Sequence, residues 1–112
     1  MDRGCDEFVQ RYYSSYDTVR GFLINFYSNE AILLWNGNCL TFNDLNAFFA
    51  QIPASFHTIE SYDAHPISNE TFLIHVNGLV QFGDIAKQFS QTFLLKQDQK
   101  TKIISDHLRF IN

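Results

Sequence analysis

Four long runs in the second half of the chain alternate between apolar and polar residues, and this alternation restricts the fold more than any other feature. Successive side chains of a β-strand point to opposite faces, so a period of two predicts strands. Short turns rich in Gly, Pro, Asn and Asp separate the runs, which predicts an antiparallel meander. The four predicted strands are residues 55–65, 71–82, 87–97 and 102–111.

The last predicted strand has two unlike faces. Leu108 and Phe110 share one face, which looks like the face of a hydrophobic core. The opposite face is too apolar to be plainly solvated and too polar to be a dry core. A face of this kind indicates an interface with another protein. Its residues in this strand are Ile103, His107, Arg109 and Ile111.

The middle strands repeat the same division into one strongly apolar face and one mixed face. Within residues 71–82 the apolar face contains Gly78, which predicts a bend or a β-bulge in mid-strand. The mixed faces would add apolar and polar contacts for a partner. These contacts are Leu73, His75, Leu79 and Leu94.

The first half of the chain predicts three helices. Apolar and aromatic residues recur at three- and four-residue steps over residues 2–16 and, in a shorter segment, over 19–26. A third helix is predicted to begin at Thr41, because Asp44 can complete a capping box with it. It should end before Pro53, which cannot continue a helix.

A short apolar strand, residues 31–35, is predicted between the second and third helices. Asn36-Gly37 follows it and predicts a tight hairpin-type turn with positive φ. Trp35 lies beside this turn. It either packs against the turn, which we favour, or contributes to the rim of a partner site.

These elements predict a single α+β domain over residues 1–112, with three helices packed on one side of a strongly bent antiparallel sheet. Aromatic residues make up 16% of the chain and Phe occurs 12 times, which suits a roomy, cone-shaped core.

Composition argues against several classes of function. A net charge of −4 disfavours direct nucleic-acid binding, because phosphate affinity depends on clustered Lys and Arg. Cys5 and Cys39 have no metal or redox spacing, so we expect no metal, no cofactor and a reducing compartment. No apolar run approaches the ~20 residues of a membrane span, and no secretion signal is evident. We expect a nuclear or cytoplasmic protein that does not bind membranes.

Arg109 needs an acidic partner if it becomes buried, because an unpaired buried charge is strongly destabilising. The candidates are Asp106, Asp63 or an acid of another protein. Alternation places Asp106 on the other face of its strand, which counts against it. The residues alone leave the choice open.

An enzyme is the main alternative class, since it would need a general base near a polarising donor in an apolar pocket. Asp63 and His65 share one strand face and could act with Tyr12, Tyr13 or Tyr16. Asp-x-His is a weak signal, however, and a pair at a strand end in solvent or at an interface accounts for it better. We therefore expect no catalytic residue.

Four segments of the chain resemble the nuclear transport factor 2 family. The resemblance implies a cone built from a bent sheet and helices, which agrees with the prediction above. It also implies that the sheet face docks on the matching domain of a second protein. Together with the order of elements it covers nearly the whole chain. The segments are residues 8–13, 34–38, 93–95 and 105–110.

Within the family, residues 35–38 and the closing Ser-Asp-x-x-Arg-Phe segment are most similar to the small NTF2-related export branch. That similarity implies a non-enzymatic light subunit of a heterodimer with a large TAP-type mRNA export receptor. Arg109 would pair with an acid of the large subunit. Nucleoporins would be contacted indirectly, through that subunit. The chain would shuttle between the nucleus, the nuclear pore and the cytoplasm.

Another branch of the family is a homodimer that imports the GDP form of the Ran GTPase. Its Ran contacts use an acid in the Trp-x-Gly turn and a cluster of acids in a later hairpin turn. Here the first position is Asn36, and the later turn, residues 82–87, keeps only Asp84 and adds Lys87. Because most of the required carboxylates are missing, we do not expect Ran binding.

Overall fold

A computed structural model describes residues 2–111, with side chains from Gly4 onward. The three predicted helices are present, the second of them as a 3-10 helix. Six strands accompany them, from β1 to β6. The elements in chain order are α1 (Asp2–Thr18), η1 (Arg20–Phe26), β1 (Tyr27–Trp35), β2 (Asn38–Thr41), α2 (Phe42–Gln51), β3 (Ser55–Pro66), β4 (Thr71–Phe82), β5 (Ile85–Gln97) and β6 (Thr101–Ile111).

The strands form one sheet in the order β2-β1-β6-β5-β4-β3. The predicted meander from β3 to β6 is confirmed, and each strand lies within two residues of its expected bounds. Three features differ from the expectation. β1 pairs with β6 in parallel, so the sheet is mixed. β1 also begins four residues earlier than expected, and β2 was not predicted.

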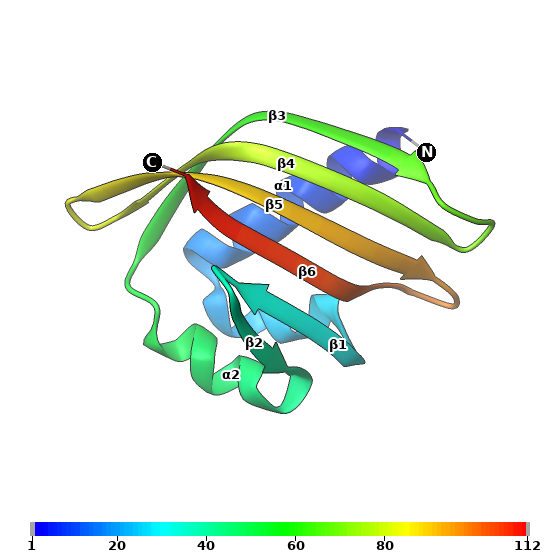
Figure 1. The fold of residues 1–112 in the computed structure, drawn as a ribbon, viewed down its shortest axis with the longest axis horizontal. Helices are drawn as coiled ribbons and strands as arrows, with labels where there is room; N and C mark the ends of the chain where they lie inside the picture. The colour runs from blue at the N-terminus through cyan, green and yellow to red at the C-terminus, as the bar shows by residue number, and fades with distance from the viewer. Residues whose placement is uncertain (1, 112) are drawn as a thin grey trace.

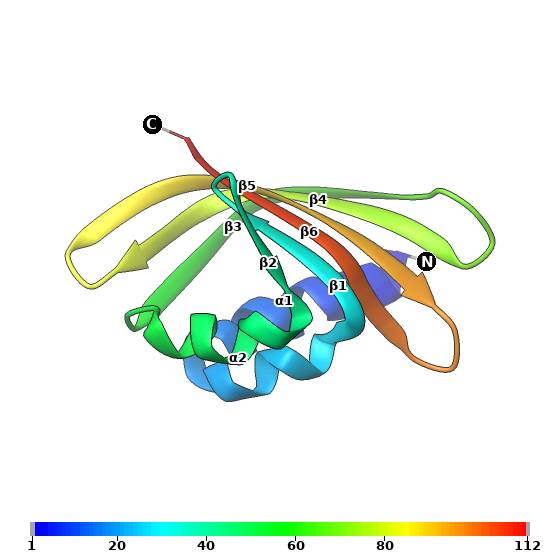
Figure 2. The same cartoon turned by 60° about the horizontal axis from the view of Figure 1, so that its bottom comes forward.

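The sheet arches over the helices, which all lie on one side of it. Figure 1 looks onto the opposite side, with α1 behind β4 and β5. Figure 2 shows the arch from below, with α1, α2 and η1 beneath it. We call the side that faces the helices the inner face and the opposite side the outer face. The fold class is therefore α+β, a curled but open sheet closed on one side by helices.

The curvature depends on a bulge opposite Gly78. The register of β3 against β4 shifts between Ile59 and Ser61, on either side of Glu60. A Cβ atom on Gly78 would clash with the backbone oxygen of Thr58. Only Gly allows the two strands to approach this closely, so the bend predicted at Gly78 is confirmed.

Aromatic rings fill the space between the inner face and α1. Phe93 of β5 is completely buried. Its ring centroid lies 5.2 Å from that of Phe8, 4.9 Å from that of Tyr12 and 6.3 Å from that of Tyr13. Such edge-to-face pairs stabilise a core beyond the area that they bury. The periodic stripe on residues 2–16 is thus the core face of α1.

The core also contains a buried carboxylate, Asp106 of β6, which has no solvent exposure. The Tyr27 hydroxyl donates to its Oδ2 at 2.7 Å, and Gln91 Nε2 donates to its Oδ1 at 2.8 Å. Tyr12 shares a hydrogen bond with the Tyr27 hydroxyl, and the Tyr13 hydroxyl donates to Gln91 Oε1 at 2.6 Å. The network connects α1, β1, β5 and β6. Every buried side-chain polar atom in the described part of the chain has a hydrogen-bond partner.

Burial raises the pKa of Asp106 to about 6, although the hydrogen bonds from Tyr27 and Gln91 act to lower it. Burial also raises the pKa of Tyr12, Tyr13 and Tyr27 well above the ordinary value of 10.0. The three hydroxyls therefore keep their protons at neutral pH and remain able to donate.

The third helix has the termini that its sequence predicted. At its start the Asp44 carboxylate accepts a hydrogen bond from the Thr41 backbone N–H at 3.0 Å, as a capping box requires. At its end Arg20 of η1 donates to the backbone oxygens of Ile52 at 2.8 Å and of Pro53 at 2.8 Å. The same guanidinium donates to the Phe49 backbone oxygen at 3.3 Å, so it holds a carbonyl of the last helical turn together with two carbonyls that follow the helix.

The prediction that Ile103 lies on the outer face is wrong. Ile103 is completely buried and belongs to the core. The register between β5 and β6 pairs Leu94 with Ser105 but Leu95 with Ile103, so Ile104 is an extra residue in β6. One extra residue reverses the alternation. Residues before the bulge therefore face opposite to what a strict period of two predicts.

Candidate protein-interaction face

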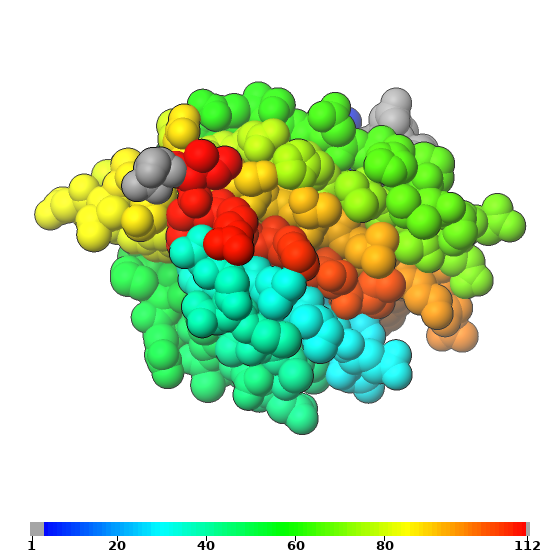
Figure 3. Space-filling model, in the orientation of Figure 1, coloured from blue at the N-terminus to red at the C-terminus, as the bar shows by residue number. Residues whose placement is uncertain are grey.

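The outer face is not covered by any element of the part of the chain that the structure describes. Figure 3 shows it from β3 across to β1 and β2, with α2 visible only below β2 at the lower edge of the view. Several large apolar side chains lie on this face among polar ones. An apolar area that its own chain leaves uncovered is characteristic of a protein-binding surface. The predicted apolar residues on it are Leu73, Leu79, Leu94 and Ile111.

These four leucine and isoleucine side chains are partly to largely accessible. Leu73 and Leu94 are register partners near one end of β4 and β5, and both are half-buried. Leu79 is 36% exposed and Ile111 is 48% exposed, and both lie toward the opposite end of the strands. Leu79 and Ile111 each pair with Gln88 on β5, one from either side. The apolar surface therefore spans β4, β5 and β6.

Three further apolar residues extend the outer face, and the sequence analysis missed them. Ile32 is register partner of Ser105 and is 39% exposed, and Leu34 is register partner of His107. Phe56 of β3 is 65% exposed. Residues 31–35 are apolar at every position, so alternation alone did not reveal which of them face outward. The observed pairing of β1 with β6 supplies that information.

Arg109 lies on the outer face near the end of β6, opposite Ser90 in the register. It is exposed and forms no ion pair with any acid whose side chain the structure describes. Asp106 is excluded as its partner because it is buried on the inner face. Asp63 belongs to β3, three strands away, and strand spacing separates it from β6 by roughly 14 Å. Neither candidate acid within the chain can reach Arg109.

The two predicted histidines of the face differ in their surroundings. His75 is half-buried, and its Nδ1 shares a hydrogen bond with the Thr92 hydroxyl at 2.7 Å. Its Nε2 lies 3.2 Å from the Ser90 hydroxyl. These contacts connect the His75 ring to the neighbouring strand β5. His107 is exposed, so it is the freer of the two for contact with another molecule.

The structure separates the residues of the enzyme alternative. Asp63 and His65 alternate with inward-facing Tyr62 and Ala64, so they lie on the outer face of β3. The tyrosines of α1 that were to act with them are buried beneath the inner face. The sheet lies between the proposed base and the proposed donors. The pattern Asp-x-His therefore does not build an active site here.

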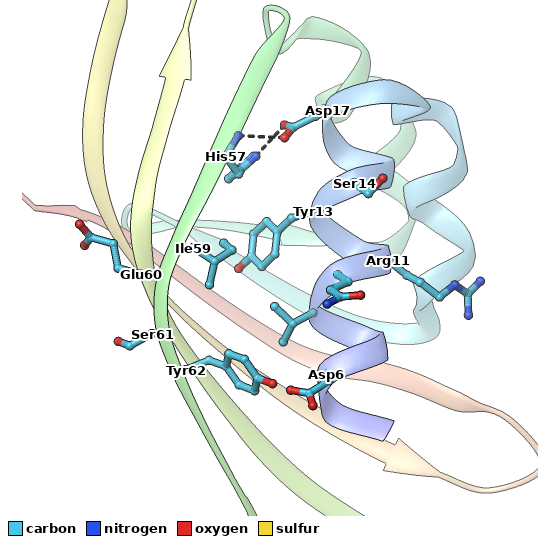
Figure 4. A pocket seen from close by; sticks show the side chains of 12 residues that line it. Asp6, Arg11, Tyr13, Ser14, Asp17, His57, Ile59, Glu60, Ser61 and Tyr62 are labelled. Atoms are coloured by element: carbon cyan, nitrogen blue, oxygen red, sulfur yellow. Dashed lines mark hydrogen bonds and ion pairs between the residues drawn. The ribbon is translucent and has the colours of Figure 1, made fainter. Parts of the chain in front are cut away.

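A groove of about 950 Å³ runs between α1 and β3, at the open edge of the sheet (Figure 4). At one end His57 Nδ1 lies 2.7 Å from Asp17 Oδ1, and the Asp17 Oδ2 accepts from the His57 backbone N–H at 2.8 Å. Burial lowers the pKa of His57, while the hydrogen bond that Asp17 accepts acts to raise it. The imidazole packs against Tyr13 and Tyr16. This pair connects α1 to the edge strand, and sequence reasoning did not identify it.

The described side chains form no cluster of His, Cys, Asp or Glu that could hold a metal ion. Within the described residues no helix is both long and apolar enough to cross a membrane. Trp35 is half-buried, and its ring packs on Phe48 of α2 and Phe110 of β6, with centroid distances of 4.9 and 5.4 Å, instead of against the turn as we expected. The outer face is thus the feature of the molecule best suited to bind another protein.

Comparison with known proteins agrees with this class of domain. The model of the nuclear transport factor 2 (NTF2) domain matches residues 4–110, and the chain belongs to this family. The chain is 36% identical to human NTF2-related export protein 2, over 96% of this chain and 85% of that protein. It is 35% identical to bovine NTF2-related export protein 1, over 96% of this chain and 86% of that protein.

Solved structures share the fold over nearly the whole chain. Nuclear transport factor 2 from Cryptosporidium parvum superimposes with a TM-score of 0.86 at 25% identity, covering 95% of this chain and 90% of that one. A chain of the yeast Ubp3 deubiquitinase and Bre5 cofactor complex gives a TM-score of 0.87 at 22% identity, covering 100% and 98%. The second likeness concerns the fold alone.

Proposed function

We propose that this chain is a non-enzymatic subunit that forms a heterodimer with a large TAP-type mRNA export receptor. Its outer face would dock on the matching domain of that receptor. The names of its relatives support a role in nuclear export. The uncovered apolar surface of the outer face supports a role that is carried out by binding.

One observation carries the proposal: Arg109 is exposed on an uncovered face and forms no ion pair with any acid whose side chain the structure describes. Both intrachain candidates are excluded, Asp106 by its burial on the inner face and Asp63 by distance. A guanidinium can form a bidentate pair with a carboxylate, and such a pair gains strength when docking excludes water. A partner with a complementary apolar face would therefore need an acid opposite Arg109.

The function would be indirect. Docking would cover the apolar surfaces of both subunits, and each would stabilise the other by mass action. Contact with nucleoporins and any contact with RNA would belong to the large subunit. The heterodimer would then shuttle between the nucleus, the nuclear pore and the cytoplasm. In this arrangement the chain needs no catalytic group, metal or cofactor.

Arg109→Ala tests the proposal. We expect this change to weaken binding to the NTF2-like domain of the large receptor by ~2–5 kcal/mol, because it leaves the partner's acid buried without a counter-charge. Isothermal titration calorimetry measures the change. Lys100→Ala is the matched control, because Lys100 is an exposed cation in the turn between β5 and β6. An unchanged dissociation constant for Arg109→Ala would reject the proposed interface.

The isolated chain offers a second test of the same proposal. Because the outer face is uncovered, we expect the chain alone to be poorly soluble or to self-associate, and co-expression with the large subunit to restore a soluble complex. Analytical ultracentrifugation separates the cases. A lone chain that sediments as a well-behaved monomer at high concentration would count against a docking role for this face.

The likeness to a solved nuclear transport factor 2 favours one alternative, a homodimeric importer of Ran-GDP. In this chain Asn36 occupies the turn position where the resemblance implies an acid, and its side chain already bonds to the backbone of β6. The turn between β4 and β5 retains one acid, Asp84. A pull-down from nuclear extract distinguishes the alternatives, since recovery of Ran-GDP in place of an export receptor would favour the importer.

A further inference from the structure

The segment of β6 around Arg109 is held by a residue from the turn between β1 and β2. The Asn36 backbone N–H donates to the backbone oxygen of Leu108 at 2.8 Å. The Phe110 backbone N–H donates to the side-chain Oδ1 of Asn36 at 3.2 Å. These two hydrogen bonds lie on either side of Arg109 in the chain. One residue, Asn36, therefore holds both peptide groups that flank the Arg109 backbone.

The backbone of the turn explains why Asn can occupy this position. Asn36 has a φ of 47° and Gly37 a φ of 94°. Asn is one of the few residues with a side chain that enters the left-handed region readily. Asn38 closes the turn by donating from its side-chain Nδ2 to the Trp35 backbone oxygen at 3.3 Å. The conformation needed for the two bonds to β6 is thus built into the Asn-Gly turn.

The same turn lies against the guanidinium of Arg109. A Cβ atom built on Gly37 would be 4.0 Å from Arg109 Nη2, so the guanidinium extends alongside the turn. The turn consequently bounds both the backbone and the charged end of Arg109.

The neutrality of Asn36 also matters. An Asp at this position could accept the same hydrogen bond from Phe110, but its carboxylate would bring a negative charge next to Arg109. At a few ångströms an opposite charge attracts strongly enough to compete with an acid supplied by a partner. The Asn amide accepts the bond without that charge. Arg109 therefore remains without an ion pair among the described side chains.

We propose that Asn36 is a positioning residue for Arg109, which it fixes through two hydrogen bonds while leaving the guanidinium charge free for an acid of a partner. The positioning concerns the free chain and is independent of any partner. The availability of the charge for docking rests on the proposed function. Two measurements separate these parts.

The first measurement uses the free chain and two variants. Asn36→Gly keeps the positive φ but removes the Oδ1 acceptor, whereas Asn36→Asp keeps an acceptor and adds a charge. We expect amide hydrogen exchange at Phe110 to become about 2- to 12-fold faster in Asn36→Gly, as loss of one hydrogen bond implies, and to change little in Asn36→Asp. Nuclear magnetic relaxation of the Arg109 side-chain Nε–H should show greater mobility in Asn36→Gly. Unchanged exchange and unchanged mobility in that variant would overturn the positioning role.

The second measurement is a double-mutant cycle of binding to the NTF2-like domain of a large export receptor. We expect Asn36→Gly to weaken binding about 2- to 12-fold in the natural chain and to have no further effect in an Arg109→Ala background. The matched control is Asn36→Gly combined with Leu73→Ala, because Leu73 lies on β4 and away from the turn. Those two effects should add, since distant sites are independent.

Asn36→Asp should weaken binding more than Asn36→Gly, and added salt should reduce the difference. Additive effects of Asn36→Gly and Arg109→Ala would overturn the inferred link to docking. If Arg109→Ala binds as tightly as the natural chain, the proposed function fails at that interface. The exchange and relaxation data on the free chain would still decide the positioning role by themselves.

Discussion

Asp106 and Arg109 are three residues apart on β6, yet they lie on opposite faces of the sheet and their charged groups have opposite surroundings. Asp106 points inward, is completely buried, and receives hydrogen bonds from Tyr27 and Gln91. Arg109 points outward, is exposed, and has no acidic partner in the part of the chain that the structure describes. Side chains of the chain itself donate hydrogen bonds to the inner carboxylate, whereas the outer guanidinium has no acidic partner among the described side chains.

The apolar residues divide in the same way. On the inner face Phe93 and Ile74 are completely buried among the side chains of the core. On the outer face Leu79 and Ile111 remain partly exposed. Most of the buried apolar packing therefore lies on the inner face, whereas the outer face is the one for which we propose binding. Substitutions on the two faces should therefore have separable effects.

The largest expected effect on stability belongs to the inner face. Phe93→Ala should lower the free energy of unfolding by about 3–5 kcal/mol, because it leaves a cavity among packed aromatic rings. Urea unfolding followed by circular dichroism measures this change. A loss below ~1 kcal/mol would show that the inner face is not the main source of stability, and the contrast between the faces would fail.

The buried carboxylate predicts an unusual dependence of stability on pH. The pKa of Asp106 is raised from an ordinary 3.8 to about 6 in the folded chain. Between these values the folded state binds more protons than the unfolded state, so this group makes the protein more stable as pH falls. Its destabilising contribution is full above pH 6, absent below about pH 4, and on the order of 2–3 kcal/mol.

Asp106→Asn isolates this contribution, because the amide can hydrogen bond at the same place but carries no charge. The free energy of unfolding of the variant minus that of the natural chain should be largest near pH 7 and should shrink toward pH 4.5. His57, whose pKa burial lowers, acts in the opposite direction but contributes equally to both proteins. A difference that is independent of pH would show that the pKa of Asp106 is not raised in the folded chain.

The curvature that separates the faces should depend on Gly78. Gly78→Ala would place a methyl group against the Thr58 backbone oxygen, which cannot rotate away as a side chain could. We expect a loss of about 1–3 kcal/mol in the free energy of unfolding. Gly4→Ala is a useful control, since a Cβ on Gly4 meets nothing within 4 Å. Equal stability of the two variants would indicate that the strands can pair at this point without a glycine at position 78.

The smallest effect on stability is expected on the outer face. Leu79→Ser should change the free energy of unfolding by only about 0.5 kcal/mol, because the side chain is already partly in water. The same substitution should weaken binding to the large subunit and improve the solubility of the lone chain. Thermal unfolding and calorimetric titration of one preparation give both values. A large loss of stability without an effect on binding would reverse the roles assigned to the two faces.

Sequence patterns predicted most of the local structure and the face on which binding is proposed. The alternation around Arg109, the capping pair Thr41 and Asp44, and the Asn36-Gly37 turn all depend on residues close together in the chain. Short-range sterics and hydrogen bonds determine such features, so they can be inferred without knowing the rest of the molecule. Family resemblance then agreed with the arrangement of these elements.

Only the tertiary structure decided which strands meet and which residues cross from one face to the other. The parallel pairing of β1 with β6 brings Ile32 and Leu34 into the outer face. The bulge at Ile104 turns Ile103 into the core. Contacts between distant segments decide these features, because the energies of alternative registers differ through packing that no local pattern records. The amino-acid sequence alone indicated that one face of the sheet would be mixed, with apolar and polar side chains. The tertiary structure decided which residues belong to that face and brought Asn36 to the backbone on either side of Arg109.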